Sequence, residues 1–384
     1  MKLIKSKIQK NCVVLVVGTR PEAIKMIPVY QALRKGNIPA VLCSTGQHAE
    51  MLDSVFSLFD IVPDYDLKIM KPGQSLFHIT DTVLEKTERL FKKLSPSLVV
   101  VQGDTTTAMT AALAAFYLHI PVAHVEAGLR SGNLHGPFPE ELNRRVIALL
   151  ASYHFAPTEF TVSALLREGI KKESVFFTGN TVVDALYSIQ KKIKTGKLIP
   201  SLFLKEKITK LKGEGRRILL LTAHRQESFN GGLHAIFSSI KTALETHPNL
   251  HVIYSSHPNP AIQKTLKEVQ LESLPNITIL GPQSYHDMVY LLSHVDGVAT
   301  DSGGITEEAI SLSKPVFVLR NETDRPEGDA ILVGTNQKSI LKEIKKFMFF
   351  DAVNLKRQSI YGDGKSSARI SSIIKGILIK KGVL

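Results

Sequence analysis

Three carboxylates stand where acidic side chains suit chemistry better than packing. Asp104 lies three residues after an apolar run at 98–101, and Glu126 directly follows a second apolar run at 121–125. Glu140 opens a helical pattern after a loop rich in glycine and proline. Carboxylates brought together in this way can act as general acid and general base. The alternatives are structural: Asp104 as a helix cap, and Glu126 with Glu140 in an exposed loop before an acidic helix start.

Groups suited to phosphate occur at two other predicted strand-to-helix turns. Arg20 opens a helical pattern two residues after Gly18, although it can also pair with Glu22 on the surface. A Ser-Gly-Gly turn at 302–304 opens another helical pattern. Backbone N–H groups at a helix N-terminus, and the planar guanidinium of arginine, are both good partners for phosphate oxygens.

Further polar residues extend this second turn. Glu308 lies within the first helical turn and can reach a ribose, or else it complements the helix dipole together with Glu307. Arg320 and Arg325 supply two guanidinium groups. His224 follows an apolar run and precedes Arg225 and a glycine pair, which favours a ligand contact. A metal site at His247, His251 and His257 is disfavoured, because alternation along a strand sends their side chains in different directions and no carboxylate joins them.

These residues need a parallel sheet to position them. Buried strands are predicted as continuous apolar runs, and helical patterns follow most of them. In an open α/β sheet, ligands bind at the carboxyl ends of the strands, so Asp104 and Glu126 are expected at one edge. The fold class is therefore α/β, with predicted strands at Val13–Val17, Ala40–Ser44, 98–101, 121–125, 154–156, 175–178, Arg217–Thr222, 251–255 and Gly297–Thr300.

Length and charge limit the possible organisation. The 384 residues suffice for two domains, and 48 basic against 35 acidic residues give a net charge of +13. The aromatic interleaving of a nucleic-acid face is missing, so no nucleic-acid partner is expected. A basic segment at 191–215 is the best boundary between domains. We expect one domain at residues 1–180, with a returning helix at 365–384, and a second at 181–364.

The cysteines and the apolar segments indicate a compartment. Cys12 and Cys43 lie at or within apolar runs without metal-like spacing, as small buried hydrophobes of a reducing compartment do. The basic N-terminus has no apolar core of a secretory signal. The most apolar stretch, 108–125, is interrupted by polar residues and proline, so membrane insertion is not expected. We therefore expect a cytoplasmic protein.

Several motifs occur together in one order along the chain. They are GTRPEAIKM from Gly18, QGDTTT from Gln102, HVEAGLRSG from His124, PFPEELNR from Pro137, AHRQESF from Ala223, TDSGGITEEA from Thr300 and RPEG from Arg325. By this set the chain resembles the non-hydrolysing UDP-N-acetylglucosamine 2-epimerase family. The resemblance implies two Rossmann-like domains facing across a cleft, as in GT-B glycosyltransferases, with the last helix returning to the first domain.

The resemblance also implies roles for particular residues. Asp104, Glu126, Glu140 and His224 match the family's catalytic positions. A UDP-sugar would be held by the matching positions Arg20, Lys25, Gln283, Met288, Ser302, Gly303, Gly304, Glu308 and Arg325. Met288 stands where relatives often have an aromatic residue. An allosteric UDP-GlcNAc site is matched in part by Gln47, His48 and Gln74, beside Gly73 where some relatives carry arginine.

The implied reaction needs neither cofactor nor metal, and the implied assembly is a homodimer. UDP is eliminated from UDP-GlcNAc to give a 2-acetamidoglucal, and it adds back after C2 is reprotonated on the other face, which gives UDP-ManNAc. Hydrolysing relatives, which release free sugar, lack the HVEAGLR and PFPEELNR pattern. The alternatives are a 2-epimerase of a modified UDP-sugar such as a diacetamido-uronic acid, a GT-B glycosyltransferase, and a non-enzymatic sugar-nucleotide sensor or nucleic-acid binder.

Overall fold

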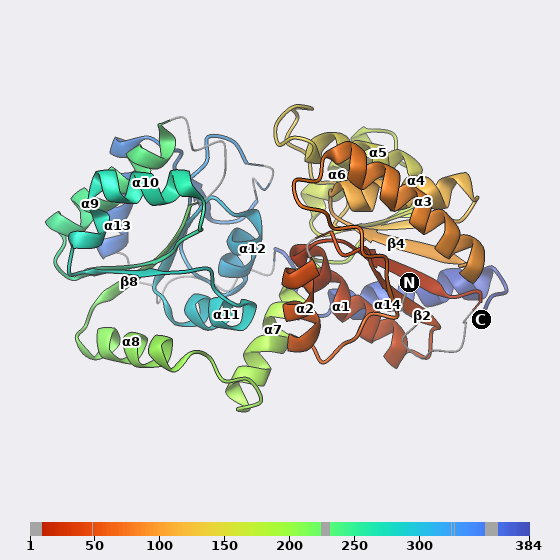
Figure 1. Ribbon diagram of the computed structural model, residues 1–384, viewed down its shortest axis with the longest axis horizontal. Helices are drawn as coiled ribbons and strands as arrows, with labels where there is room; N and C mark the ends of the chain where they lie inside the picture. The colour runs from red at the N-terminus through yellow and green to blue at the C-terminus, as the bar shows by residue number, and fades with distance from the viewer. Residues whose placement is uncertain (1–9, 48, 224–230, 324, 326, 350–359) are drawn as a thin grey trace. The chain divides into compact units, whose positions relative to one another are not determined.

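The computed structural model describes residues 10–47, 49–223, 231–323, 325, 327–349 and 360–384. The chain divides into two compact units, Met1–Ala185 with Tyr361–Leu384, and Leu186–Ile360. Each unit has a parallel sheet with helices on its faces (Figure 1). Within the described residues, the helices are all too short or too polar to span a bilayer.

The sheet of the first unit has the order β3-β2-β1-β4-β5-β6-β7 across its seven described strands. Valine and other apolar residues fill its centre, where each strand is covered on both faces. The strands are β1 (Val13–Val17), β2 (Ala40–Ser44), β3 (Tyr65–Asp66), β4 (Leu98–Gln102), β5 (Val122–Val125), β6 (Tyr153–Ala156) and β7 (Val175–Phe177).

The helices of this unit lie on both faces of the sheet (Figure 1). Apolar side chains of α3, α4 and α5 pack with alternate residues of β1, β2 and β4, such as Val14, Val16 and Val99. The helices are α1 (Arg20–Lys35), α2 (Ala49–Leu58), α3 (Leu76–Leu94), α4 (Thr106–Tyr117), α5 (Glu140–Leu150), α6 (Glu159–Arg167) and α7 (Thr181–Lys194), with a 3₁₀ turn at Lys172–Ser174.

The last helix returns to the first unit, as the resemblance implies. Helix α14 (Ser366–Lys380) packs beside α1. Its N-terminus is anchored by Asp184 of α7, whose carboxylate accepts hydrogen bonds from the backbone N–H groups of Ser366 at 3.1 Å and Ser367 at 2.9 Å. A carboxylate at this position satisfies backbone donors that the helix itself leaves unpaired.

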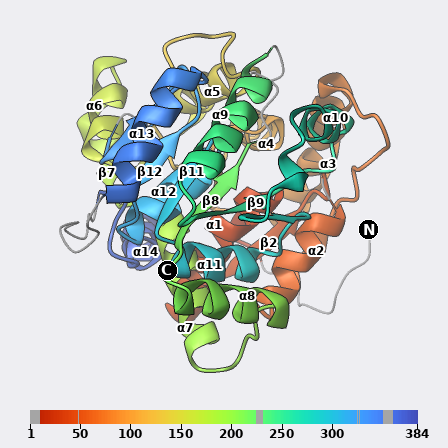
Figure 2. The same ribbon diagram turned by 90° about the vertical axis from the view of Figure 1, so that its left-hand side faces the viewer.

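The sheet of the second unit repeats the same order from a new start, β10-β9-β8-β11-β12-β13. Its core lies between the sheet and the helices α9, α10 and α13, and Figure 2 shows α9 and α13 along these strands. The strands are β8 (Arg217–Thr222), β9 (Leu250–Ser255), β10 (Ile277–Leu280), β11 (Gly297–Thr300), β12 (Val316–Val318) and β13 (Ala330–Leu332).

Part of the segment that we expect as a boundary is helical. Helix α8 (Leu202–Gly213) occupies much of 191–215, because Leu204, Ile208 and Leu211 recur at helical spacing and are buried. The other helices of the unit are α9 (Gly232–Thr246), α10 (Pro260–Val269), α11 (Tyr285–His294), α12 (Gly303–Ser311) and α13 (Gln337–Phe349), with a 3₁₀ turn at Leu271–Ser273.

Both sheets therefore contain the doubly wound order 3-2-1-4-5-6, which is the Rossmann-like pattern, and the first sheet adds β7 as a seventh strand. In such a sheet the direction of winding reverses between the first and fourth strands, and ligands bind in the crevice outside the carboxyl ends of these two strands. The reversal lies between β1 and β4 in the first unit and between β8 and β11 in the second. The motifs at 18–26, 102–107, 223–229 and 300–309 all follow these four strands.

Candidate active site

The turn after β1 is closed by a buried carboxylate. Glu22 accepts hydrogen bonds from the backbone N–H groups of Gly18 at 2.9 Å and Thr19 at 2.7 Å, and from Thr105 Oγ1 of the β4–α4 turn at 2.7 Å. Burial raises the pKa of Glu22, while these hydrogen bonds lower it. A Cβ atom at Gly18 would lie 2.6 Å from Thr107 Oγ1, so only glycine fits this close approach. Glu22 thus ties the β1 and β4 ends together.

Glu126 is held in a buried ion pair at the end of β5. Lys25 Nζ lies 2.6 Å from each carboxylate oxygen, and only 8% of the Lys25 side chain and 3% of the Glu126 side chain are exposed. The amide of Gln102 donates to Oε2, and Asn180 Nδ2 donates to Oε1 at 3.4 Å. Pairing with the ammonium group favours the ionised carboxylate. The Glu126 carboxylate therefore contacts one cation and two amide donors.

The backbone of Glu126 has an unusual conformation. Its φ is +64°, in the left-handed region that glycine adopts with less strain than other residues. A non-glycine residue in this region persists only where its surroundings over-determine it, and such residues cluster at functional sites. The conformation and the buried ion pair together make Glu126 a candidate for a chemical role.

Asp104 lies at the end of the neighbouring strand β4. Arg144 of α5 binds its Oδ2 through Nε at 2.9 Å and through a second guanidinium nitrogen at 2.7 Å. Asn143 of the same helix donates to the backbone carbonyl of Asp104 at 2.8 Å. Thr105, whose Oγ1 accepts from the N–H of Ala108, caps α4. The cap alternative for Asp104 is therefore wrong, and its carboxylate pairs with Arg144 instead.

Glu140 begins α5, three and four residues before Asn143 and Arg144. Residues at this spacing share one face of a helix, so Glu140 lies on the face that binds Asp104. The next residue, Glu141, has a different task. Its fully buried carboxylate accepts from the backbone N–H of Ser131 at 2.9 Å and thereby folds the glycine-rich loop onto the helix.

The structure thus gathers Asp104, Glu126 and Lys25 at the ends of β4 and β5, where Gln102 is the register partner of Val125. The partners Gln102, Asn180 and Arg144 were missed from the sequence, because each approaches its carboxylate from a distant part of the chain. The one available signal was Gln102 itself, a polar residue at the end of a buried strand.

A buried histidine supports the loop that carries Asp104. His124 Nε2 lies 2.7 Å from the carbonyl oxygen of Gly103, and no part of the residue is exposed. Burial lowers the pKa of His124 to about 3, so the ring is neutral and donates this hydrogen bond. His154, the register partner of His124 on β6, has a pKa lowered to about 4, also mainly by burial. Both are core histidines.

Two residues that the resemblance assigns to an allosteric site also come together in the first unit. Gln74 Nε2 donates to the backbone carbonyl of Gln47 at 3.1 Å. Thr107 Oγ1, near the Gly18 turn, donates to Gln47 Oε1 at 2.7 Å. His48 lies outside the described residues. The loops after β2 and before α3 are thus connected to the β1 and β4 ends.

In the second unit, the turn after β11 leads into α12. Ser302 is the N-cap, and the Thr300 hydroxyl accepts from the backbone N–H of Ser302 at 2.9 Å. Arg325 Nε donates to the fully buried Glu307 at 2.7 Å, and its guanidinium lies where a Cβ of Gly303 would be. Nothing lies within 4 Å of a Cβ built on Gly304. A helix N-terminus beside an arginine is suited to a phosphate.

Three other predicted residues belong to α12, to α11 or to the segment before α11. Glu308 is buried and accepts a hydrogen bond from the Tyr285 hydroxyl at 2.8 Å. Met288 lies one turn later on α11 and is half-buried. Gln283 donates to the carbonyl of Gly281 at 2.8 Å. His224, the fourth predicted catalytic residue, lies outside the described residues.

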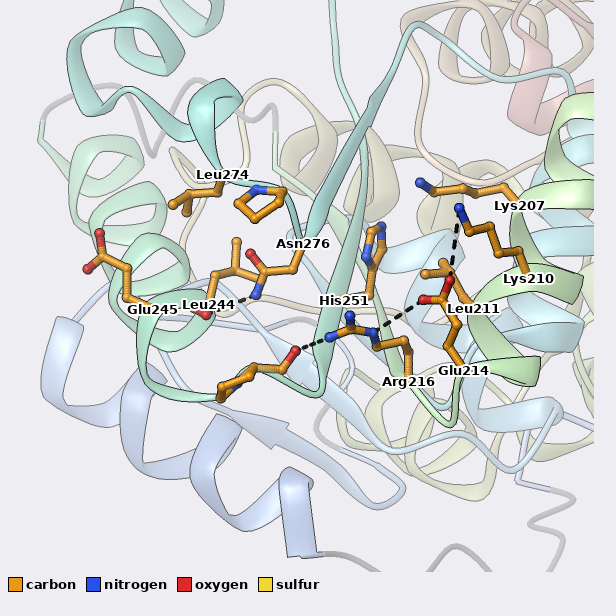
Figure 3. A pocket seen from close by; sticks show the side chains of 12 residues that line it. Lys207, Lys210, Leu211, Glu214, Arg216, Leu244, Glu245, His251, Leu274 and Asn276 are labelled. Carbon is orange, nitrogen blue, oxygen red and sulfur yellow. Dashed lines mark hydrogen bonds and ion pairs between the residues drawn. The ribbon is translucent and has the colours of Figure 1, made fainter.

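A separate cavity of about 470 Å³ lies at the opposite edge of the second sheet (Figure 3). It is lined by Arg216, Pro248 and Asn276, which precede β8, β9 and β10, and by Lys207 and Lys210 of α8. Its basic groups are offset by local acids, since Glu214 lies 3.4 Å from Arg216 and 3.9 Å from Lys210. The cavity is therefore at the amino ends of the strands, away from the motifs.

Comparisons with known proteins show which family the chain resembles. Residues 31–375 match the family model of UDP-N-acetylglucosamine 2-epimerase. The chain is 42% identical over 372 residues to the UDP-N-acetylglucosamine 2-epimerase of Yersinia pestis, with 94% of this chain and 98% of the relative covered. The corresponding Escherichia coli K12 protein is 42% identical over 373 residues, with the same coverage.

Two solved structures are similar over almost the whole chain. The UDP-GlcNAc 2-epimerase of Neisseria meningitidis, bound to UDP-GlcNAc, superposes with a TM-score of 0.86 at 41% identity, covering 96% of this chain and 99% of that one. The S. aureus MnaA–UDP co-structure also gives a TM-score of 0.86, at 36% identity, covering 97% and 98%. The GT-B-like α/β fold class is therefore confirmed.

Proposed function

Because the chain belongs to the UDP-N-acetylglucosamine 2-epimerase family, we propose that it interconverts UDP-GlcNAc and UDP-ManNAc by inverting C2 of the sugar. The observation that carries the proposal is the pair of charged carboxylates at neighbouring strand ends, Glu126 on Lys25 and Asp104 on Arg144. A glycosyltransferase that joins a sugar to an acceptor has no need of this arrangement. Inversion of a C–H centre needs both a base and an acid.

The proposed reaction proceeds by elimination and re-addition, because no adjacent carbonyl acidifies the C2 hydrogen. A carboxylate removes the C2 proton while the C1–O bond breaks and its electron pair leaves with UDP. The product is a 2-acetamidoglucal with a C1=C2 double bond. A carboxylic acid then protonates C2 from the opposite face as a UDP oxygen re-forms the bond to C1. Protons and electrons balance without a cofactor.

We assign the proton transfers to Asp104, Glu126 and Glu140. The ion pair with Lys25 supports Glu126 as a base, and the guanidinium of Arg144 orients the carboxyl group of Asp104. Glu140 shares the face of α5 whose Arg144 binds Asp104, which supports its assignment as the third carboxyl group. We propose His224 as a further active-site group on the strength of its place after β8.

Retention of UDP between the two steps is assigned chiefly to the second unit. Amides of Ser302, Gly303 and Gly304 at the start of α12, with Arg325, suit the diphosphate. Glu308, oriented by the Tyr285 hydroxyl, suits a ribose. The remaining matched positions are Arg20, Lys25, Gln283 and Met288.

We also propose a second, regulatory sugar-nucleotide site at Gln47, His48 and Gln74. The proposal is supported by the hydrogen bonds that link Gln74 to Gln47 and Gln47 to Thr107, since Thr107 lies against the Gly18 turn of the candidate active site. A ligand bound to these glutamines would act on that turn directly.

We propose that the protein is a cytoplasmic homodimer. Phe116 and Tyr117 at the end of α4 and Leu149 at the end of the adjacent α5 have exposed fractions of 51%, 63% and 80%. Parallel neighbouring helices place these apolar side chains at one end of the layer, where a second copy would cover them. The cytoplasmic assignment is supported by two buried, unpaired cysteines, Cys12 and Cys43.

The substitution Glu126→Gln tests the catalytic assignment. Turnover of UDP-GlcNAc to UDP-ManNAc should be lost, whereas the affinity for UDP should stay within about tenfold, because a proton-transfer group need not contribute to ground-state binding. Product formation is followed by ¹H NMR and UDP binding by calorimetry. Unchanged turnover in a folded variant would refute the role of Glu126, and a collapse of UDP binding would make it a binding residue.

A further inference from the structure

Asn180 has one orientation only. Its Oδ1 accepts the backbone N–H of Val182 at 3.0 Å, at the start of α7, so its Nδ2 must be the atom that faces Glu126 Oε1 at 3.4 Å. The backbone N–H of Asn180 donates to the carbonyl oxygen of Tyr361 at 2.7 Å, where the chain re-enters the first unit. Asn180 therefore links the carboxylate to the start of α7 and to Tyr361.

Gln102 faces the other oxygen of the same carboxylate. It is the last residue of β4, and 3% of it is exposed. Its Nε2 donates to Glu126 Oε2, and this orientation is required because an ionised carboxylate only accepts hydrogen bonds. The two amides therefore reach Glu126 from different elements, one contacting each oxygen, in addition to Lys25.

We propose that Gln102 and Asn180 are positioning residues for the catalytic base, Glu126. The two amides fix the plane of the Glu126 carboxylate and stabilise its ionised form. Lysine supplies charge but a flexible geometry, whereas two amides held by a strand end and a helix start define a direction. The inference rests on the proposed epimerase function. It assigns the two amides no contact with substrate.

Isosteric charged variants separate positioning from mere structural support. Asn180→Asp keeps the acceptor for the Val182 N–H but replaces the amide nitrogen that faces Glu126 with a carboxylate oxygen. Gln102→Glu likewise puts a carboxylate oxygen in place of the amide nitrogen at the end of β4. A like charge at this distance disfavours ionisation of Glu126. The acidic limb of the pH profile of kcat/KM should move to higher pH, and kcat at pH 7 should fall by roughly tenfold or more.

Asn180→Ala gives a second comparison. If Asn180 had a purely structural role, Asn180→Ala, which loses both side-chain hydrogen bonds, should lower kcat/KM more than Asn180→Asp does. If Asn180 positions Glu126, Asn180→Asp should lower kcat/KM more than Asn180→Ala at pH 6, and this difference should shrink as the pH rises. UDP affinity should stay within about threefold of the parent in all three variants, since ground-state binding does not use these amides.

Matched controls are available at a distance from the site. Gln190 donates to the Ser293 hydroxyl in the second unit, and Asn37 is exposed, so Gln190→Glu and Asn37→Asp repeat the same chemical changes elsewhere. Both controls should keep the parental pH profile. If Gln102→Glu and Asn180→Asp also keep it while wild type epimerises UDP-GlcNAc, the positioning role is overturned and the proposed function stands. If wild type fails to epimerise, the proposed function itself fails.

Discussion

At the scale of single residues, the Lys25–Glu126 pair places two opposite charges where almost no solvent reaches them. Two charges with almost no exposure are tolerable only while each compensates the other. The sequence marked Glu126 by its place after a strand, but its partner comes from 101 residues earlier. Spacing along the chain contains no information about such pairs, whereas it does predict caps and strand ends, which are local.

The ion pair predicts a double-mutant cycle. Lys25→Met should lower the free energy of unfolding by roughly 3–5 kcal/mol, because it leaves an uncompensated buried carboxylate. Adding Glu126→Gln should restore much of this loss, since the remaining amide is neutral. Chemical denaturation measures both.

As a control, Arg89→Met breaks an exposed pair with Glu85 and should change stability by less than about 1 kcal/mol. A cost for Lys25→Met as small as that of Arg89→Met would show that the Lys25–Glu126 pair is not electrostatically buried.

At the scale of elements, strand ends and helix starts were the most predictable features. Long valine-rich runs such as Val13–Val17 define buried strands, and the glycine turns after them are explicit in the sequence. Four strands were missed, because runs of two to four residues show no clear periodicity: Tyr65–Asp66, Ile277–Leu280, Val316–Val318 and Ala330–Leu332. Helix α8 was not predicted, because its apolar residues Leu204, Ile208 and Leu211 form only a narrow stripe among many lysines.

The start of α12 offers a test with adjacent glycines. Gly303→Ala would place a Cβ 2.5 Å from an Arg325 nitrogen, which forces the guanidinium away from buried Glu307, so stability should fall by roughly 1–3 kcal/mol. Gly304→Ala meets open space and should be neutral or slightly stabilising. Thermal unfolding compares the two. Equal effects would mean that Arg325 is not held by this contact.

At the scale of the whole molecule, the repeated strand order gives each unit its own point at which the winding of the sheet reverses. Each unit carries part of the candidate site residues at that point. The α/β class was predictable from alternating strand and helix patterns. The exact order of the strands was not, because it depends on crossover connections that the sequence does not display.

Buried histidines in both units give the protein a predicted acid sensitivity. Burial lowers the pKa to about 3 for His124 and to about 4 for His154 and His251. Unfolded histidine titrates near 6.5, so between about pH 4 and 6.5 the unfolded chain binds more protons than the folded one. Stability should therefore fall as the pH drops through this window, by up to ~1.4 kcal/mol per pH unit for each histidine.

Thermal melts from pH 7.5 to 4.5 measure this dependence. His251→Gln removes one of the three titrations and should flatten the fall in Tm, whereas His135→Gln, at an exposed loop position, should leave it unchanged. A wild-type Tm that stays constant down to pH 4.5 would show that these rings are not buried as neutral groups.

The most direct test is NMR of UDP-GlcNAc incubated with the protein in D2O. Proton removal at C2 and return from solvent predict UDP-ManNAc with deuterium at C2, together with deuterium at C2 of the remaining UDP-GlcNAc. The anomeric signals of both nucleotides report this through loss of the coupling to the C2 proton. UDP-GlcNAc that keeps its C2 proton with no UDP-ManNAc formed, or free ManNAc as the product, would contradict the account.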